Sequence, residues 1–64
     1  MSSRQWYIKL MLECMRKSVH ESTGDESAML LKKASMYKSF AESFGGNITD
    51  NEIGVINITM DGEV

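Results

Sequence analysis

The first third of the chain alternates polar and apolar residues with the period of a helix. Its polar positions are Gln5, Lys9, Glu13, Arg16 and His20. They fall four, four, three and four residues apart, which makes one narrow stripe on a helix. The preceding Ser2-Ser3-Arg4-Gln5 has the form of a capping box, in which a serine and a glutamine satisfy free backbone N–H groups. The pattern predicts a helix over residues 3–21.

The apolar part of this helix is wider than one buried face requires. A central row keeps the helical spacing and consists of Ile8, Leu12, Met15 and Val19. Beside it lies a second group, Trp6, Tyr7, Leu10, Met11 and Cys14. A single partner helix covers only about a 100° stripe. We therefore expect part of this arc to pack against another chain.

A second helix is predicted over residues 25–44. The turn-forming run Ser22-Thr23-Gly24-Asp25 ends the first helix, and Thr23 with Glu26 offers another capping box. Its heptad positions alternate large and small residues and are Leu30, Ala34, Tyr37, Ala41 and Phe44. Beside them lie Met29, Met36 and Phe40. Gly45-Gly46-Asn47 should end the helix, because glycine reaches the left-handed conformation of a helix cap without steric cost.

The C-terminal residues change in character and favour a β-strand. Residues 53–60 are rich in β-branched side chains and alternate between two faces. One face carries Ile56, Ile58 and Met60, and the other carries Val55, Asn57 and Thr59. A lone strand needs a ladder partner. Three partners are possible. One is the short Ile48-Thr49 segment, which a turn at Asp50-Asn51 would join to the strand. The others are the same strand of another subunit and the sheet edge of a different protein.

These patterns predict a mostly α fold in two parts: an antiparallel helical hairpin over residues 1–46 and a β-forming tail over residues 47–64. A chain of 64 residues buries a marginal core, and small folds usually add disulfides, a metal or a partner subunit. A single cysteine excludes an intrachain disulfide. We therefore expect a homo-oligomer, either a dimeric four-helix bundle or a larger ring.

The candidate chemistry is weak, and we expect neither an enzyme nor a bound metal or cofactor. Cys14 and His20 lie six positions apart, which places them on different sides of one helix, so they form no dyad within a subunit. The tail also holds four acidic residues, Asp50, Glu52, Asp61 and Glu63. Their order lacks the ligand series of a calcium loop and favours a solvated turn.

The charge balance gives no global attraction to nucleic acid or anionic lipid, since seven basic residues stand against nine acidic ones. Binding of phosphates would require a ring of subunits that brings many basic side chains together, namely those of Arg16, Lys17, Lys32, Lys33 and Lys38. The sequence shows neither a signal-peptide pattern nor a run of about 18 apolar residues that would span a membrane. We expect a cytoplasmic protein, in the host cytoplasm if the chain is viral.

The surplus apolar surface favours a homo-oligomeric protein-interaction module, an adaptor or inhibitor of another protein. This general shape resembles small proteins of viruses and mobile elements. The expected self-assembly or partner interface consists of Trp6, Tyr7, Leu10, Met11, Cys14, Met36, Phe40, Val55, Ile56 and Ile58. An alternative is a structural or nucleic-acid-packaging component, because a helical hairpin followed by a β tail resembles the oligomerisation core of viral small terminase subunits.

Overall fold

The chain folds into α-helices, as a computed structural model shows for residues 2–21 and 23–62. The remaining residues, Met1, Ser22, Glu63 and Val64, lie outside the described part of the chain, so the Ser22 position of the expected turn and the Glu63 position of the expected acidic tail are not assessed. Within the described part the helices are α1 (Ser3–His20), α2 (Gly24–Glu42) and α3 (Asp50–Gly62). The mostly α fold class is thereby confirmed.

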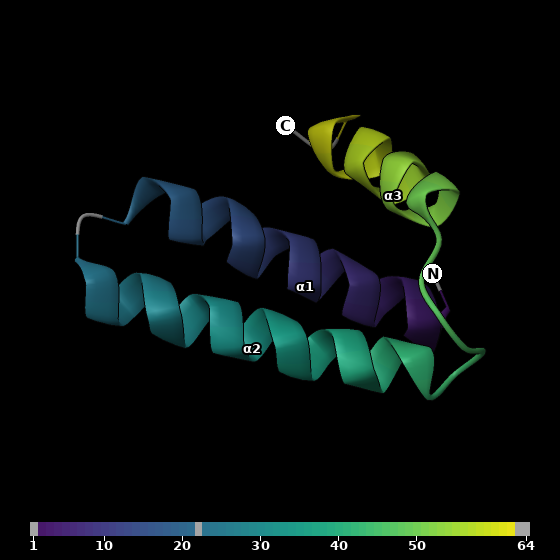
Figure 1. Cartoon of the computed structure of the whole chain (residues 1–64). Coiled ribbons are helices and arrows are strands. Elements are labelled where there is room, and N and C mark those ends of the chain that lie inside the picture. Colours follow the sequence, from purple (N-terminus) through teal and green to yellow (C-terminus); the bar gives the residue numbers. More distant parts are fainter. Residues whose placement is uncertain (1, 22, 63–64) are drawn as a thin grey trace.

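The first two helices form an antiparallel hairpin (Figure 1). The Ser2 hydroxyl accepts a hydrogen bond from the Gln5 N–H, and the Gln5 side chain accepts one from the Ser2 N–H, so the expected capping box is present. Thr23 caps α2 by accepting from the Glu26 N–H at 3.4 Å. These local contacts are the reason that sequence patterns locate both helix starts.

The glycine pair after α2 ends that helix, as the sequence predicts. Gly45 and Gly46 have φ values of 149° and 86°, which side-chain-bearing residues rarely adopt. The Gly46 N–H donates to the Glu42 carbonyl oxygen at 2.8 Å. This turn redirects the chain from the end of α2 back towards α1.

The predicted C-terminal strand is wrong: residues 50–62 form the helix α3, and none of the described residues lies in a strand. Thr49 and Glu52 make a capping box, since the Thr49 N–H donates to Glu52 Oε1 and the Glu52 N–H donates to Thr49 Oγ1, each at 3.2 Å. Ile53, Ile56 and Met60 then follow the three-four spacing of a helix and pack on the core. Packing against α1 therefore overrides the β-propensity of the segment.

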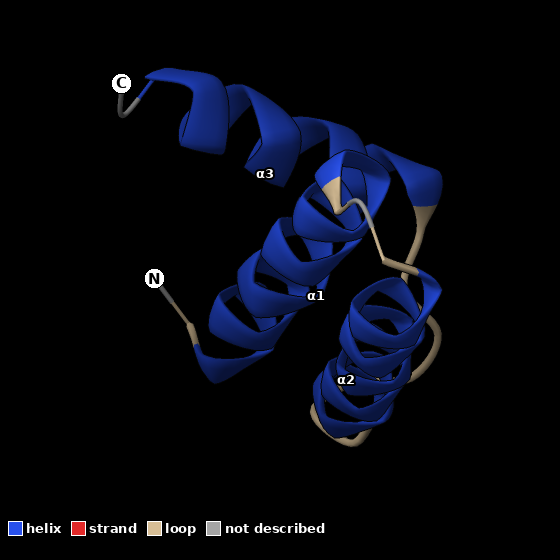
Figure 2. Ribbon diagram, turned by 90° about the vertical axis from the view of Figure 1, so that its left-hand side faces the viewer, coloured by secondary structure: helices blue, strands red, loops and turns tan. Residues whose placement is uncertain are grey.

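The helices form three layers, with α1 in the middle (Figure 2). Within residues 2–21 and 23–62, α2 and α3 each pack against α1 and not against each other. The core residues are Ile8, Met11, Leu12, Ala34, Ala41, Ile56 and Met60. The small side chains of Ala34 and Ala41 let α1 and α2 approach closely, as the alternation of large and small heptad residues predicts. The helix α3 replaces the β tail on which the resemblance to small terminase subunits depends.

Candidate functional site

Arg4, in the first turn of α1, joins all the other parts of the fold. Its Nε and Nη2 donate to the two carboxylate oxygens of Glu52 at 2.7 and 2.9 Å. Nη1 donates to the carbonyl oxygens of Ala41 and Gly46 at 3.2 and 2.8 Å, and Nη2 also donates to that of Asn47 at 2.8 Å. Every N–H donor of the guanidinium is therefore used. The contact fixes the end of α2, the following loop and the start of α3 on one side chain.

The carboxylate of Glu52 is held in its charged form. Hydrogen bonds from Arg4, and then from the Thr49 backbone, lower the pKa of Glu52 from 4.5 to about 2. A two-point contact of this kind is geometrically specific as well as charge-assisted. It orients α3, so it determines which side of α3 faces solvent.

A second contact between α1 and α3 is more exposed. Arg16 Nη2 donates to Asn57 Oδ1 at 2.8 Å, and Nη1 lies 3.0 Å from Asp61 Oδ1. Because both partners of this ion pair are largely in solvent, the pair contributes little to stability. The opposite charges of Arg16 and Asp61 therefore lie side by side at the surface.

An aromatic cluster lies where the end of α2 meets the start of α1. The Tyr7 ring centroid lies 6.3, 5.4 and 5.9 Å from those of Tyr37, Phe40 and Phe44. Nearby, the Lys9 ammonium lies 5.5 Å from the Trp6 ring centroid. Trp6, Phe40 and Phe44 all remain exposed. This end of the hairpin is therefore rigid and apolar, as interface anchors commonly are.

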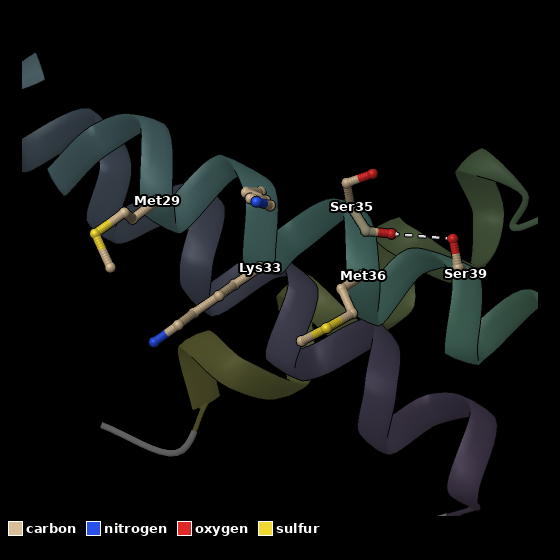
Figure 3. Close-up of a pocket in the computed structure, with 6 residues that line it drawn as sticks. Met29, Lys33, Ser35, Met36 and Ser39 are labelled. Carbon is tan, nitrogen blue, oxygen red and sulfur yellow. Dashed lines mark hydrogen bonds between the residues drawn. The ribbon is translucent and has the colours of Figure 1, made fainter. Parts of the chain in front are cut away.

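The side of α2 that faces away from α1 carries a shallow depression, which we call the α2 outer face. Its lining residues are Met29, Lys32, Lys33, Ser35, Met36 and Ser39. Figure 3 shows Met29, Lys33 and Met36 extending from the same side of the helix, with Ser35 and Ser39 on the neighbouring side. Met29 and Met36 are 61% and 48% exposed. The depression is thus apolar at its centre and basic around it.

The side of α3 that faces away from α1 forms a second exposed surface, the α3 outer face, which carries Val55 and Ile58. Ile58 lies two positions from both buried Ile56 and buried Met60, so on a helix it points to the opposite side. Val55 and Ile58 are 52% and 74% exposed. This surface is apolar, whereas Asp61 lies beside α1 in its ion pair with Arg16 and Asp50 borders a depression with Met11 and Leu12 of α1.

The residues expected at the interface fall into three groups by burial. Trp6, Met36, Phe40, Val55 and Ile58 are exposed. Tyr7 and Cys14 are half-buried against the core, and Leu10 is half-buried as well. Met11 and Ile56 are buried in the core of the single chain. The five exposed residues therefore lie on several separate surfaces. The other five are partly or fully covered within the single chain.

Sequence reasoning missed Met29 and the neighbouring lysines as a surface of their own, and it missed Arg4 and Glu52 as a structural contact. The four-residue repeat of Met29 and Lys33, with Met36 three further on, was a usable signal for a shared helix side. Thr49-Asp50-Asn51-Glu52 also has the form of a capping box. The pairing of Arg4 with residues near 41–52 leaves no local pattern.

The reactive side chains are dispersed. Cys14 is half-buried on α1, whereas His20 is exposed in its last turn. Across residues 2–21 and 23–62, no three His, Cys, Asp or Glu side chains gather as a metal site would require. In the same residues, each helix is too short or too polar to cross a bilayer.

At the hairpin loop, two carboxylates lie together. A hydrogen bond and the charge of Glu26 raise the pKa of Glu21 above its usual value of 4.5. Glu21 and Glu26 border a small depression with Met29, Leu30 and Lys33. The two carboxylates therefore lie beside Lys33 of the α2 outer face.

The comparisons with known proteins give no relatives. No protein-family model, curated protein or solved structure matches the chain. The surfaces described above therefore carry the functional argument.

Proposed function

We propose that the chain is a non-enzymatic, homo-oligomeric protein-interaction module that acts as an adaptor or inhibitor of another protein in the cytoplasm, that of the host if the chain is viral. The observation that carries this proposal is the number of exposed apolar side chains compared with the number in the core. Among the described residues, ten large hydrophobic side chains are exposed, whereas seven residues form the core. Clustered exposed apolar side chains mark binding surfaces in small proteins.

The rigidity of the exposed groups supports the same function. Tyr7 packs against Phe40 and Phe44, so these exposed rings lose little conformational freedom on binding. Met29 and Met36, in contrast, are adaptable side chains that fit irregular partners. Anchors and adaptable residues together suit a surface that recognises proteins.

The experiment is capture of a partner by the tagged chain in its native host, with the mass of the captured complex measured. We expect one partner at a defined stoichiometry. Replacement of an exposed anchor, Phe40→Asp or Trp6→Ala, should reduce its recovery about tenfold. Lys17→Ala, on the exposed side of α1, serves as a matched control and should leave recovery unchanged.

Two results would count against the proposal. In the first, the tagged chain captures no protein at a defined stoichiometry and is itself monomeric. The other is equal recovery with Phe40→Asp, Trp6→Ala and the control, because recovery would then be independent of the exposed anchors.

A further inference from the structure

A depression lies where α1, α2 and α3 meet the loop that follows the glycine turn, and we call it the inter-helix depression. Its floor is formed by Met11 and Leu12 of α1, which are 5% and 6% exposed. Ile48 of the loop and Ile53 of α3 also line it, and both pack against the core. Its volume is about 330 Å³, within the range of about 300 to 1,000 Å³ that small-ligand sites occupy.

The arrangement of the helices leaves this space open. Within residues 2–21 and 23–62, α2 and α3 pack against α1 and not against each other (Figure 2). The walls are nevertheless held in place by Arg4, whose Nη2 donates to the Asn47 carbonyl oxygen and to Glu52 Oε1. These two residues directly precede Ile48 and Ile53 in the chain. A preformed wall loses little conformational freedom when a ligand binds.

Two opposite charges border the depression. Lys38 of α2 and Asp50, the first residue of α3, both line it. Across the described ranges, neither side chain forms a hydrogen bond or an ion pair, with the other or with any further residue. The Asp50 carboxylate is not needed as the helix cap, because the Thr49 hydroxyl accepts from the Glu52 N–H. The depression therefore offers one cation and one anion beside an apolar floor.

We propose that the inter-helix depression binds a small zwitterion with an apolar body, namely a free amino acid with a large apolar side chain. The ligand carboxylate pairs with Lys38, its ammonium pairs with Asp50, and its apolar body covers Met11 and Leu12. Few polar groups around an apolar floor are typical of small-molecule sites. The site is separate from the exposed aromatic anchors, so it adds a function to the protein-interaction function proposed above.

The position of the two charges determines how tightly such a ligand should bind. Lys38 and Asp50 are exposed at the rim, where water weakens ion pairs. We expect a dissociation constant on the order of 1 mM, and we expect loss of one charge contact to weaken binding about threefold to fivefold.

A series of three ligands tests the chemistry. Phenylalanine carries both charges, phenylalaninamide lacks the carboxylate, and N-acetylphenylalanine lacks the ammonium. Each is titrated into the wild-type chain while nuclear magnetic resonance follows the methyl groups of Ile48 and Ile53. Phenylalanine should shift both residues saturably, and each analogue should bind about threefold to fivefold more weakly because it leaves one charge of the depression unused.

Two variants locate the charges. Lys38→Gln should weaken binding of phenylalanine about threefold to fivefold and leave that of phenylalaninamide unchanged. Asp50→Asn should weaken binding of phenylalanine to the same extent and leave that of N-acetylphenylalanine unchanged. Both positions are exposed and helical, so the fold should persist, which far-ultraviolet circular dichroism checks.

Matched controls remove the same charges elsewhere. Lys32→Gln changes an exposed lysine of the same helix as Lys38, on the α2 outer face. Asp25→Asn changes an aspartate in the first turn of α2, as Asp50 is in the first turn of α3. Both controls should bind phenylalanine as the wild type does.

Three results would overturn the inference. The first is the absence of a saturable shift at Ile48 and Ile53 up to about 20 mM phenylalanine. The second is equal binding of the three ligands, and the third is an equal effect of the site variants and their controls. Each result leaves the proposed protein-interaction function standing, because partner capture is measured through the exposed anchors.

Discussion

At the scale of single residues, Arg4 joins the start of α1 to the end of α2, the glycine turn and the start of α3. Its acceptors are the Glu52 carboxylate and three backbone carbonyls that lie 37 to 43 residues away in the chain. The sequence locates Arg4 only as part of a capping box, because a pairing over that distance has no periodic signature. The contact exists because the turn at Gly45-Gly46 brings the carbonyl oxygens of Gly46 and Asn47 to the start of α1.

The first prediction concerns this guanidinium. Arg4→Lys keeps the charge but loses the planar set of donors, so it cannot hold Glu52 and the carbonyls together. We expect the melting temperature to fall by about 5 °C or more. Arg16→Lys is the matched control, because Arg16 also joins α1 to α3 but its contact is exposed to solvent. The melting temperature of this variant should differ from that of the wild type by about 1 °C or less. Equal effects of the two substitutions would show that Arg4 is not the central contact.

The second prediction follows from the depressed pKa of Glu52. A carboxyl whose pKa is about 2 in the folded chain and 4.5 without its partners stabilises the fold fully above pH 4.5. That stabilisation is lost as the pH falls from 4.5 towards 2, because the unfolded chain binds the proton more readily. The melting-temperature difference between the wild type and Glu52→Gln should therefore be constant above pH 4.5 and shrink below it. A difference that does not change between pH 5 and 2.5 would exclude this origin.

At the scale of elements, both hairpin helices follow from local patterns, whereas α3 has a local signal only at its start, in the Thr49–Glu52 capping box. The capping box at Ser2, the Thr23 N-cap and the glycine turn locate α1 and α2 because these contacts join residues close in sequence. In residues 53–60, two spacings coexist: Ile56, Ile58 and Met60 alternate as in a strand, while Ile53, Ile56 and Met60 repeat as in a helix. Only the presence of α1 as a packing surface decides between them, and this long-range contact cannot be seen in a single sequence.

The third prediction tests the helical state of that segment. Gly54 lies inside α3, and a Cβ added there would meet no atom within 4 Å. Gly54→Ala should therefore raise the free energy of unfolding by about 0.5 to 1 kcal/mol, because alanine loses less conformational entropy in a helix. The measurement is urea denaturation in dilute solution.

A matched glycine gives the opposite expectation. A Cβ at Gly46 would also meet open space, but its φ of 86° is strained for alanine. Gly46→Ala should therefore lower the free energy of unfolding. If Gly54→Ala were destabilising as well, residues 50–62 would not be an unstrained helix in solution.

At the scale of the whole molecule, the sequence indicates the surplus of apolar surface but not its distribution. Met11 and Ile56 were expected at an interface and are buried, because α2 and α3 both pack against α1. The α2 outer face remains uncovered, since α3 occupies the opposite layer.

The most direct measurement of self-assembly is the molar mass of the wild-type chain in solution, by sedimentation equilibrium from about 1 to 500 µM. We predict a mass that rises with concentration above that of one chain, because association covers the exposed apolar side chains. A mass equal to one chain at every concentration would contradict the account.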